Sequence, residues 1–226
     1  MRDRTTQSPP LRRHVRDEIQ RRILSGESLP GERLGQQSLA RELGVGQGTI
    51  RESLLELEWL GLVESIDGLG AFVGKLDAER LVEAYQVREY HEGLAARLAC
   101  NWASQADISA LRVLANRIWN LSKHDNVEEM GSADRAFHLR IVHLSHNSVL
   151  ARLAEGYRTL GMAIRTTRDP GVVYDEHLRI IDAICQKMPD EAERLARQHV
   201  LEARLIIEQE ATENLFAPKW VVNGGD

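Results

Sequence analysis

Apolar side chains recur at helical spacing in three separate stretches of the N-terminal third of the chain. The first stretch, residues 15–24, buries one face of a helix that ends at Ser25-Gly26. The second, residues 39–43, is closed by Gly44, because glycine readily adopts the left-handed backbone that ends a helix. The third covers residues 50–57. The apolar members of these stripes are Val15, Ile19, Ile23 and Leu24, then Leu39, Ala40 and Leu43, then Ile50, Leu54 and Leu57.

The hydrophobic period changes after Gly61. Short apolar runs at residues 62–63 and 71–73 are separated by a segment that contains the pair Asp67-Gly68. Two apolar runs around an Asp-Gly pair are typical of a β-hairpin with a tight turn. The N-terminal third is therefore predicted to form a helix-turn-helix followed by a small β-hairpin wing.

The third stripe also determines which side chains of its helix face outward. Because the stripe is buried, four residues at the N-terminal end of the same helix are expected to face solvent. This is the end that a recognition helix inserts into the major groove of DNA. The alternative is a helical hairpin that packs a core and binds nothing, which the wing and the upstream helix argue against. The four outward residues are expected to be Gln47, Gly48, Thr49 and Arg51.

The rest of the chain is helical by pattern, with nothing that resembles a pair of strands. Short links between the helices imply an antiparallel bundle of about six helices, so the protein is predicted to be mostly α. Asp107 and Asp169 are expected to cap two of these helices. The expected helices cover residues 78–104, 107–122, 127–145, 148–167, 172–187 and 189–214.

Length and composition fit two domains without a membrane segment. The chain has 226 residues, of which 42% are hydrophobic. No apolar run approaches a membrane span and the N-terminus lacks an apolar signal region, so no membrane partner and a cytoplasmic location are expected. Cys100 and Cys185 lie among apolar residues of predicted helices, which indicates reduced core thiols and argues against a disulfide or a zinc knuckle.

The net charge of −5 would by itself argue against a nucleic-acid-binding protein. Residues 1–75, however, carry 11 basic and 11 acidic side chains, so the acidic excess falls on the remainder. Arginines cluster near the N-terminus, where Arg12 and Arg13 are candidates for phosphate contacts. The alternative is a solvated arm, which we favour for Arg2 and Arg4.

Three of the eight histidines lie on helix faces that point into the predicted bundle. His138 follows Asp134 by four residues, so both side chains project from one face of their helix. His177 and His199 each lie on the apolar stripe of another helix. Three histidines and a carboxylate from three helices are a plausible site for a first-row metal. On periodicity alone, hydrogen-bonded core histidines are the more common outcome.

Arg88 lies on the stripe of the first bundle helix that is expected to face inward. A half-buried guanidinium is suited to bidentate contact with the carboxylate of a small effector. The alternative is a buried ion pair with Glu92, Asp134 or another carboxylate of the bundle.

Residues 15–73 resemble the DNA-binding domain of GntR-family transcription regulators. The shared features are an Ile-rich first helix, the Pro30-Gly31 turn, Leu-Ala-Arg-Glu-Leu-Gly-Val at 39–45, Arg51-Glu52, and a Gly-rich wing. Relatives often carry Arg at the positions of Gln37 and Gln47. Gln favours adenine where Arg favours guanine, so the operator is expected to differ there. The expected DNA contacts are Arg12, Arg13, Gln37, Gln47, Gly48, Thr49, Arg51, Asp67 and Gly68.

The helical part resembles the FCD effector domain of the FadR branch of that family. Asp134-Arg-Ala-Phe-His138, Glu176-His177 and Arg197-Gln-His199 follow its metal-ligand pattern in order and spacing. The resemblance implies that Asp134, His138, His177 and His199 hold a divalent metal ion, commonly zinc, with nickel or manganese as alternatives. A small carboxylic-acid effector would then fill the open positions of the ion.

These observations predict a flexible arm at 1–10, a winged helix-turn-helix at 11–75, an FCD effector-binding and dimerisation domain at 76–215, and a loose tail at 216–226. The expected function is a ligand-responsive repressor that binds palindromic operator DNA as a homodimer. One alternative is a constitutive DNA-binding regulator with a structural metal. Another is a metal-dependent hydrolase, against which no general base or nucleophile lies at helical spacing beside the ligands.

Overall fold

The computed structural model describes residues 9–75, 77–124, 127–161, 168–213 and 215–216. The chain divides into two compact units, with the division between residues 77 and 78. Of the N-terminal arm expected at 1–10, residues 1–8 lie outside the described residues, whereas residues 9 and 10 begin the first helix. Of the tail expected at 216–226, residues 217–226 lie outside the described residues.

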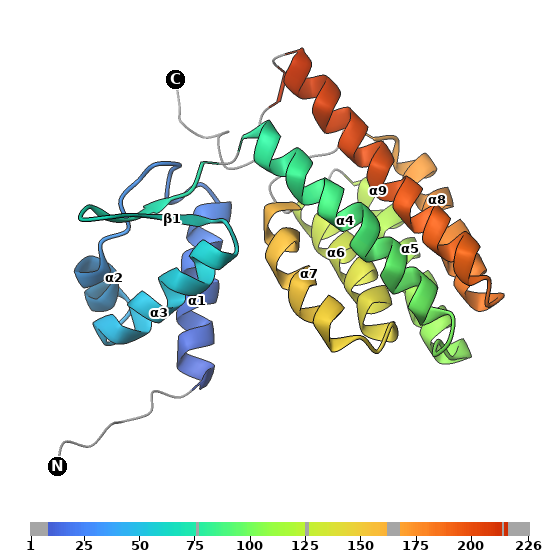
Figure 1. The fold of residues 1–226 in the computed structure, drawn as a ribbon, viewed down its shortest axis with the longest axis horizontal. Coiled ribbons are helices and arrows are strands. Elements are labelled where there is room, and N and C mark those ends of the chain that lie inside the picture. Colours follow the sequence, from blue (N-terminus) through green and yellow to red (C-terminus); the bar gives the residue numbers. More distant parts are fainter. Residues whose placement is uncertain (1–8, 76, 125–126, 162–167, 214, 217–226) are drawn as a thin grey trace. The chain divides into compact units, whose positions relative to one another are not determined.

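The first unit is a helix-turn-helix followed by a β-hairpin, as the hydrophobic pattern predicted (Figure 1). The three apolar stripes form its core, in which Ile19, Ile50 and Leu57 are fully buried. Gly44, between the second and third helices, has a φ of +65°, the left-handed conformation that favours glycine. Its elements are α1 (Pro9–Leu24), α2 (Gln36–Glu42), α3 (Gln47–Trp59), β1 (Val63–Ile66) and β2 (Gly70–Val73).

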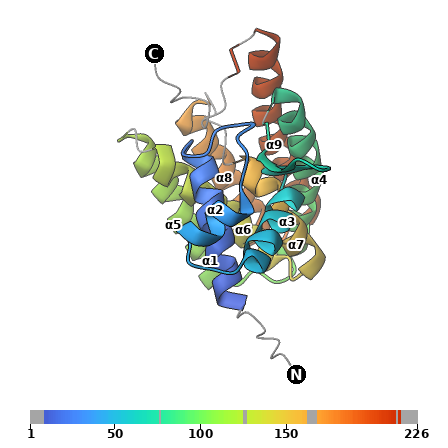
Figure 2. The ribbon, with the colours of Figure 1, turned by 90° about the vertical axis from the view of Figure 1, so that its left-hand side faces the viewer.

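Within this unit, α3 packs against α1 and α2 (Figure 2). The strands β1 and β2 pair in antiparallel fashion and are joined by the predicted turn. Gly68 in that turn has a φ of +74°, which explains the Asp-Gly pair. The segment before α2 runs along β2, where Arg33 forms a bridge with Phe72. The wing is therefore held by three segments of the chain.

The second unit is a bundle of six helices within the described residues (Figure 1). The helix α4 packs against α6, α7 and α9, while α5 packs against α6 and α8. Gly93 of α4 faces Arg197 of α9, and any larger side chain there would overlap the aliphatic part of that arginine. The helices are α4 (Ala78–Ala99), α5 (Gln105–Ser122), α6 (Val127–Leu144), α7 (Ser148–Gly161), α8 (Pro170–Cys185) and α9 (Pro189–Thr212).

Several helix ends differ from the prediction by one or two residues, and the largest difference is at the first link of the bundle. The first bundle helix ends at Ala99 and not at residue 104, and the cap of the next helix is Ser104 and not Asp107. Ser104 accepts a hydrogen bond from the amide of Asp107, whose carboxylate accepts one from the Ser104 amide. Asp169 caps α8, as predicted. Residues 162–167, where the fourth bundle helix was expected to continue, lie outside the described residues.

The core of the bundle is apolar and surrounds the predicted histidines. Leu111, Phe137 and Ile181 are fully buried in it. Both cysteines are free thiols, and Cys100 is buried, in agreement with the prediction. Among the described residues, no helix is both long and apolar enough to cross a membrane.

Candidate functional site

The predicted recognition helix presents three of its four expected residues to solvent. Gln47, Gly48 and Arg51 are exposed in the first turns of α3. The expectation for Thr49 was wrong, because its side chain is only 1% exposed. The buried face of α3 is wider than its apolar stripe and also includes Ser53, whose hydroxyl donates to the carbonyl of Arg12 in α1.

The remaining predicted DNA contacts lie on three elements. Gln37 is exposed on α2, and Asp67 and Gly68 are exposed in the turn of the wing. Arg13 is exposed on α1. Arg12, also on α1, forms ion pairs with two carboxylates of α3, at 2.9 Å from Glu56 and 3.4 Å from Glu52.

The three predicted histidines converge inside the bundle from three helices. His138 comes from α6, His177 from α8 and His199 from α9, and all three are buried. One ring nitrogen of each lies within 4.8 Å of the others. Two nitrogen ligands about 2 Å from one ion lie at most about 4 Å apart, so the three rings are close to the spacing of a single metal site.

Asp134, one turn before His138 on α6, supplies an oxygen to this cluster. Its Oδ1 atom lies 3.7 Å from Nε2 of His138 and 3.6 Å from Nε2 of His177. The Asp134 side chain is 36% exposed, whereas His177 is fully buried. The structure thus brings together the four residues that the sequence singled out.

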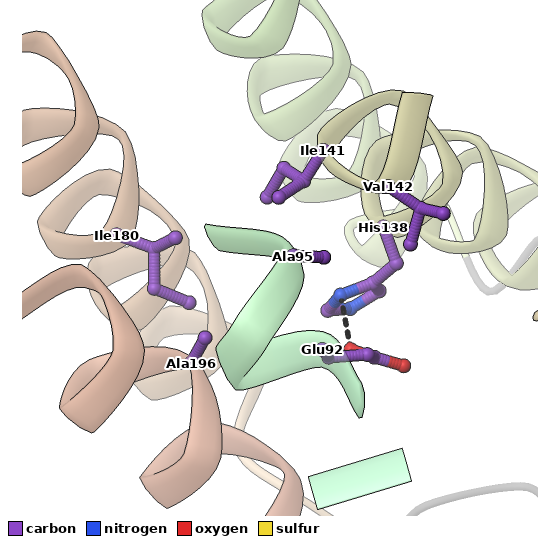
Figure 3. Close-up of a pocket in the computed structure, with 7 residues that line it drawn as sticks. All are labelled: Glu92, Ala95, His138, Ile141, Val142, Ile180 and Ala196. Carbon is purple, nitrogen blue, oxygen red and sulfur yellow. Dashed lines mark ion pairs between the residues drawn. The ribbon is translucent and has the colours of Figure 1, made fainter. Parts of the chain in front are cut away.

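The ring of His138 is oriented by a carboxylate that the sequence did not assign to this site. Its Nδ1 atom lies 2.9 Å from Oε2 of Glu92 (Figure 3). The other oxygen of Glu92 accepts a 2.9 Å hydrogen bond from Nε of Arg88, one turn earlier on α4. Glu92 is buried and the Arg88 side chain is only 11% exposed, so the ion-pair alternative for Arg88 describes what the structure contains.

A second relay of the same kind holds His199. Its Nδ1 atom lies 2.7 Å from Oε2 of Glu176 on α8. Arg168 donates to that same carboxylate oxygen at 2.7 Å and to the backbone carbonyl of His199 at 3.2 Å. In metal sites, a carboxylate on the outer nitrogen of a ligand histidine fixes the ring and raises its basicity.

The inner nitrogens of the cluster have no hydrogen-bond partner among the described residues. They are Nε2 of His138 and both ring nitrogens of His177. Buried polar atoms without a partner are costly, and in native proteins they commonly mark an ion or a water. Because the Nδ1 atoms of His138 and His199 are each engaged by a carboxylate, their Nε2 atoms are the ones available to a metal.

The pKa values follow from burial and from these contacts. Burial favours the neutral ring of His138, but Glu92 and Asp134 outweigh it and raise the pKa of His138 to about 9. Burial lowers the pKa of His177 and of His199, which keeps both rings neutral. The pKa of Asp134 is lowered, chiefly because the contact with His138 outweighs the desolvation of the carboxylate. Neutral rings and an ionised carboxylate are the forms that bind a metal, so His177, His199 and Asp134 already have the required form, whereas His138 must release a proton when the ion binds.

A small cavity adjoins His138 on the side of Glu92 (Figure 3). Its wall includes Ala95, Ile180 and Ala196. The cavity has room for about one water molecule, so it is much smaller than the usual pocket for a metabolite.

Sequence reasoning missed four residues of this region. Glu92 was considered only as a partner of Arg88, and Glu176 appeared only beside His177. Arg168 carried no signal, since it lies in a link between helices. His91 was not singled out, yet it is buried and its Nε2 atom lies 2.8 Å from the carbonyl of Leu150 on α7. The only sign of these contacts in the sequence was the spacing of Arg88 and Glu92, because an Arg and a Glu four residues apart lie on one face of a helix.

Comparison with known proteins gives the family of both parts. The model described as bacterial regulatory proteins, gntR family, matches residues 11–73, and the FCD domain model matches residues 83–203. The chain is 30% identical over 176 residues to the Nta operon transcriptional regulator of Aminobacter aminovorans, covering 76% of this chain and 82% of that protein. It is 26% identical over 219 residues to the Glc operon transcriptional activator of Escherichia coli strain K12, covering 84% and 86%.

The fold is found among solved structures as well. The E. coli McbR/YncC structure matches with a TM-score of 0.73 and 20% identity, over 88% of this chain and 98% of that one. The family and the relatives are transcription regulators and not enzymes. The chain therefore belongs to the GntR family of bacterial transcription regulators, with a helix-turn-helix that binds operator DNA and an FCD domain that binds a small-molecule effector.

Proposed function

We propose that this regulator responds to a small carboxylic acid that binds at a divalent metal ion inside the helical unit. The observation that carries the proposal is the convergence of three buried imidazoles, two of which have ring nitrogens without a hydrogen-bond partner among the described residues. The proposed ligands are Asp134, His138, His177 and His199. The ion supplies a Lewis-acidic site for a carboxylate, and the chain's own residues decide where that carboxylate lies.

The ligand set favours zinc, with nickel or manganese as alternatives. Three imidazoles and one carboxylate suit a borderline first-row ion better than calcium or magnesium, which prefer oxygen ligands. Glu92 and Glu176 hold two of the three rings, so part of the cost of assembling the site is met by the fold itself.

Arg88 is the proposed partner of the effector carboxylate. Its Nε atom is engaged by Glu92 and its guanidinium lies over the ring of Tyr85, 4.4 Å from the centroid, so the edge formed by its two terminal amino groups is the one proposed to meet the effector. That edge of the guanidinium can receive a carboxylate in bidentate fashion while Glu92 keeps the opposite edge in place. Because Glu92 also holds His138, effector and ion would be linked through one carboxylate.

On DNA, we propose that Arg51, Gln47 and Gly48 of α3 read base edges in the major groove. Asp67 and Gly68 of the wing would approach the DNA backbone, with Gln37 and Arg13 as flanking contacts. Thr49 is not retained as a side-chain contact, because it is buried.

A homodimer on a palindromic operator is part of the proposal. The helix α4 exposes Val87, Tyr90 and Leu94 at helical spacing, and α7, which packs on α4, exposes Val149 and Leu153. Large apolar side chains gathered on two neighbouring helices are typical of an interface. A second copy of the same surface would cover them with two-fold symmetry. Repression is proposed as the mode of action, because it needs only occupancy of the operator and no contact with the polymerase.

One observation favours a second candidate. The cavity beside His138 holds only about one water molecule, which fits a constitutive regulator whose ion is structural. In that case the ion would stabilise the bundle, and no acid would change the affinity for DNA.

The two candidates are separated by a titration of the full-length, metal-loaded protein with a panel of small mono- and dicarboxylic acids. The readouts are the melting temperature and the affinity for an operator selected from random-sequence DNA. For a responsive regulator, the acid and the operator must change each other's affinity by the same factor, typically about 5- to 150-fold. An Arg88→Lys variant should keep its metal and its operator affinity but respond weakly to the acid. A metal-loaded protein that no acid affects would favour the constitutive candidate.

A further inference from the structure

The arginines of the DNA-binding unit fall into two sets. Eight arginines lie within residues 9–75. Four of them form ion pairs with carboxylates of the unit, and all four lie on α1: Arg12, Arg16, Arg21 and Arg22. The other four, Arg13, Arg33, Arg41 and Arg51, have no ion pair with any residue that the structure describes. Of these, Arg33, Arg41 and Arg51 lie beyond α1.

The paired set is already neutralised. Arg12 lies between Glu52 and Glu56 of α3, and Arg16 shares Glu56 while contacting Asp17. Two arginines thus face three carboxylates, so this cluster presents no net positive charge to a phosphate. A DNA strand that approached Arg12 would also approach the two glutamates. These ion pairs join α1 to α3, so the arginines of α1 help to hold the recognition helix in place.

Arg33 has a different environment. Its backbone forms a bridge with Phe72 of β2, which places it along the wing. Its Nε and Nη2 atoms lie 3.7 Å from the position that a Cβ of Gly70 would occupy. The guanidinium therefore lies over the end of the hairpin, and the Arg33 residue is exposed. The turn of this hairpin, α2 and the first turn of α3 lie at the same end of the unit (Figure 1).

We propose that Arg33 is a phosphate contact of the wing and that Arg12 is not a DNA contact. The exposed arginine beside the turn supplies an uncompensated positive charge where the wing meets the DNA backbone. Each phosphate that a protein neutralises releases a condensed counterion, and this release sets the salt dependence of binding. An arginine that is already paired with two carboxylates neutralises little phosphate charge, so it causes the release of few counterions from the DNA.

The test compares single-charge removals in the full-length protein. Binding to a labelled duplex of arbitrary sequence is measured by fluorescence anisotropy over a series of KCl concentrations. Arg33→Gln should reduce the slope of log K against log salt by about one per bound chain. Arg12→Gln should leave this slope close to that of the parent. Arg21→Gln is the matched control, since Arg21 is paired with Glu18 and Glu27 on α1 and its removal changes the net charge equally.

A second variant separates charge from wing structure. Arg33→Lys keeps the positive charge but not the planar group over Gly70, so it should restore the slope that Arg33→Gln loses. Equal slopes for Arg33→Gln and the parent would overturn the proposal. So would an Arg33→Lys slope as low as that of Arg33→Gln, or a fall in slope for Arg12→Gln as large as the one for Arg33→Gln.

Discussion

Charged side chains are arranged differently in the two units of this protein. In the helical unit, Arg88, Glu92 and His138 form a buried chain in which each polar group holds the next. In the DNA-binding unit, the ion pairs of α1 lie at the surface, and Arg51 has no ion pair with any described residue. Breaking a buried pair leaves a desolvated charge, whereas exposed pairs contribute little. Substitutions in the DNA-binding unit should therefore change DNA binding, and substitutions in the helical unit should change metal content and stability.

The largest expected effect is the loss of the ion in His177→Ala. His177 is fully buried, neither of its nitrogens has a hydrogen-bond partner among the described residues, and its ring lies against Phe137. We expect about one divalent ion per chain in the parent and close to none in the variant, measured by elemental analysis after purification without chelator. Chelation should lower the melting temperature of the parent and not of the variant, because an ion that binds only the folded state stabilises it. A parent without metal would return these histidines to a packing role.

The second effect tests the buried relay against a surface pair. Glu92→Ala leaves Arg88 and His138 without their shared carboxylate, which should lower the free energy of unfolding by about 3 to 5 kcal/mol. Glu191→Ala removes the partner of Arg194 on the exposed side of α9 and should unfold like the parent. Chemical denaturation of metal-free samples gives both values. Equal losses in the two variants would remove the difference between buried and exposed pairs.

A smaller effect is expected at the second relay. Glu176→Gln keeps an oxygen that can accept from Nδ1 of His199 but removes the charge that raises the basicity of the ring. Competition with a chromophoric chelator should show metal affinity that is about 10- to 100-fold weaker, with the stoichiometry retained. Unchanged affinity, in a protein whose parent binds the ion, would assign Glu176 a purely structural role while leaving the metal site in place.

On the other unit, Arg51→Ala should cost about 1 to 3 kcal/mol of discrimination between operator and arbitrary DNA. Arg51 is exposed on α3, so its removal should leave the melting temperature unchanged. Parallel anisotropy titrations with the two duplexes measure this discrimination. If the variant prefers the operator as strongly as the parent does, Arg51 does not read bases.

The sequence predicted helix faces well because helical periodicity is a local property. The stripes that contain His177 and His199 were visible within single helices, and the structure brings both rings together. Thr49 was assigned to the wrong face, because the width of the buried face of α3 depends on how α1 packs across it. Such packing is a tertiary property that the period of one helix does not contain.

Partners across helices were the part that could not be predicted. Glu176 is adjacent to His177 in the chain, but its carboxylate bonds to His199 on another helix. Arg88 was left with several candidate carboxylates, and only the fold selects Glu92 among them. The choice depends on helix rotation and separation, which Gly93 and its contact with Arg197 help to set between α4 and α9.

The smallest expected effect concerns His91, a buried titratable group of the helical unit that lies outside the proposed ligand set. Burial lowers the pKa of His91, and its Nε2 atom lies at hydrogen-bonding distance from the carbonyl of Leu150. Above the unfolded pKa of about 6.5, both states are neutral and the full stability is present. As the pH falls below that value, the unfolded chain takes up a proton that the folded protein resists, so stability is lost. His91→Gln keeps a neutral donor, and its unfolding free energy should therefore fall less than that of the parent between pH 7 and pH 5. Because other groups titrate equally in both proteins, the difference between the two curves isolates His91. Parallel curves would mean that His91 is protonated as readily in the bundle as in the unfolded chain.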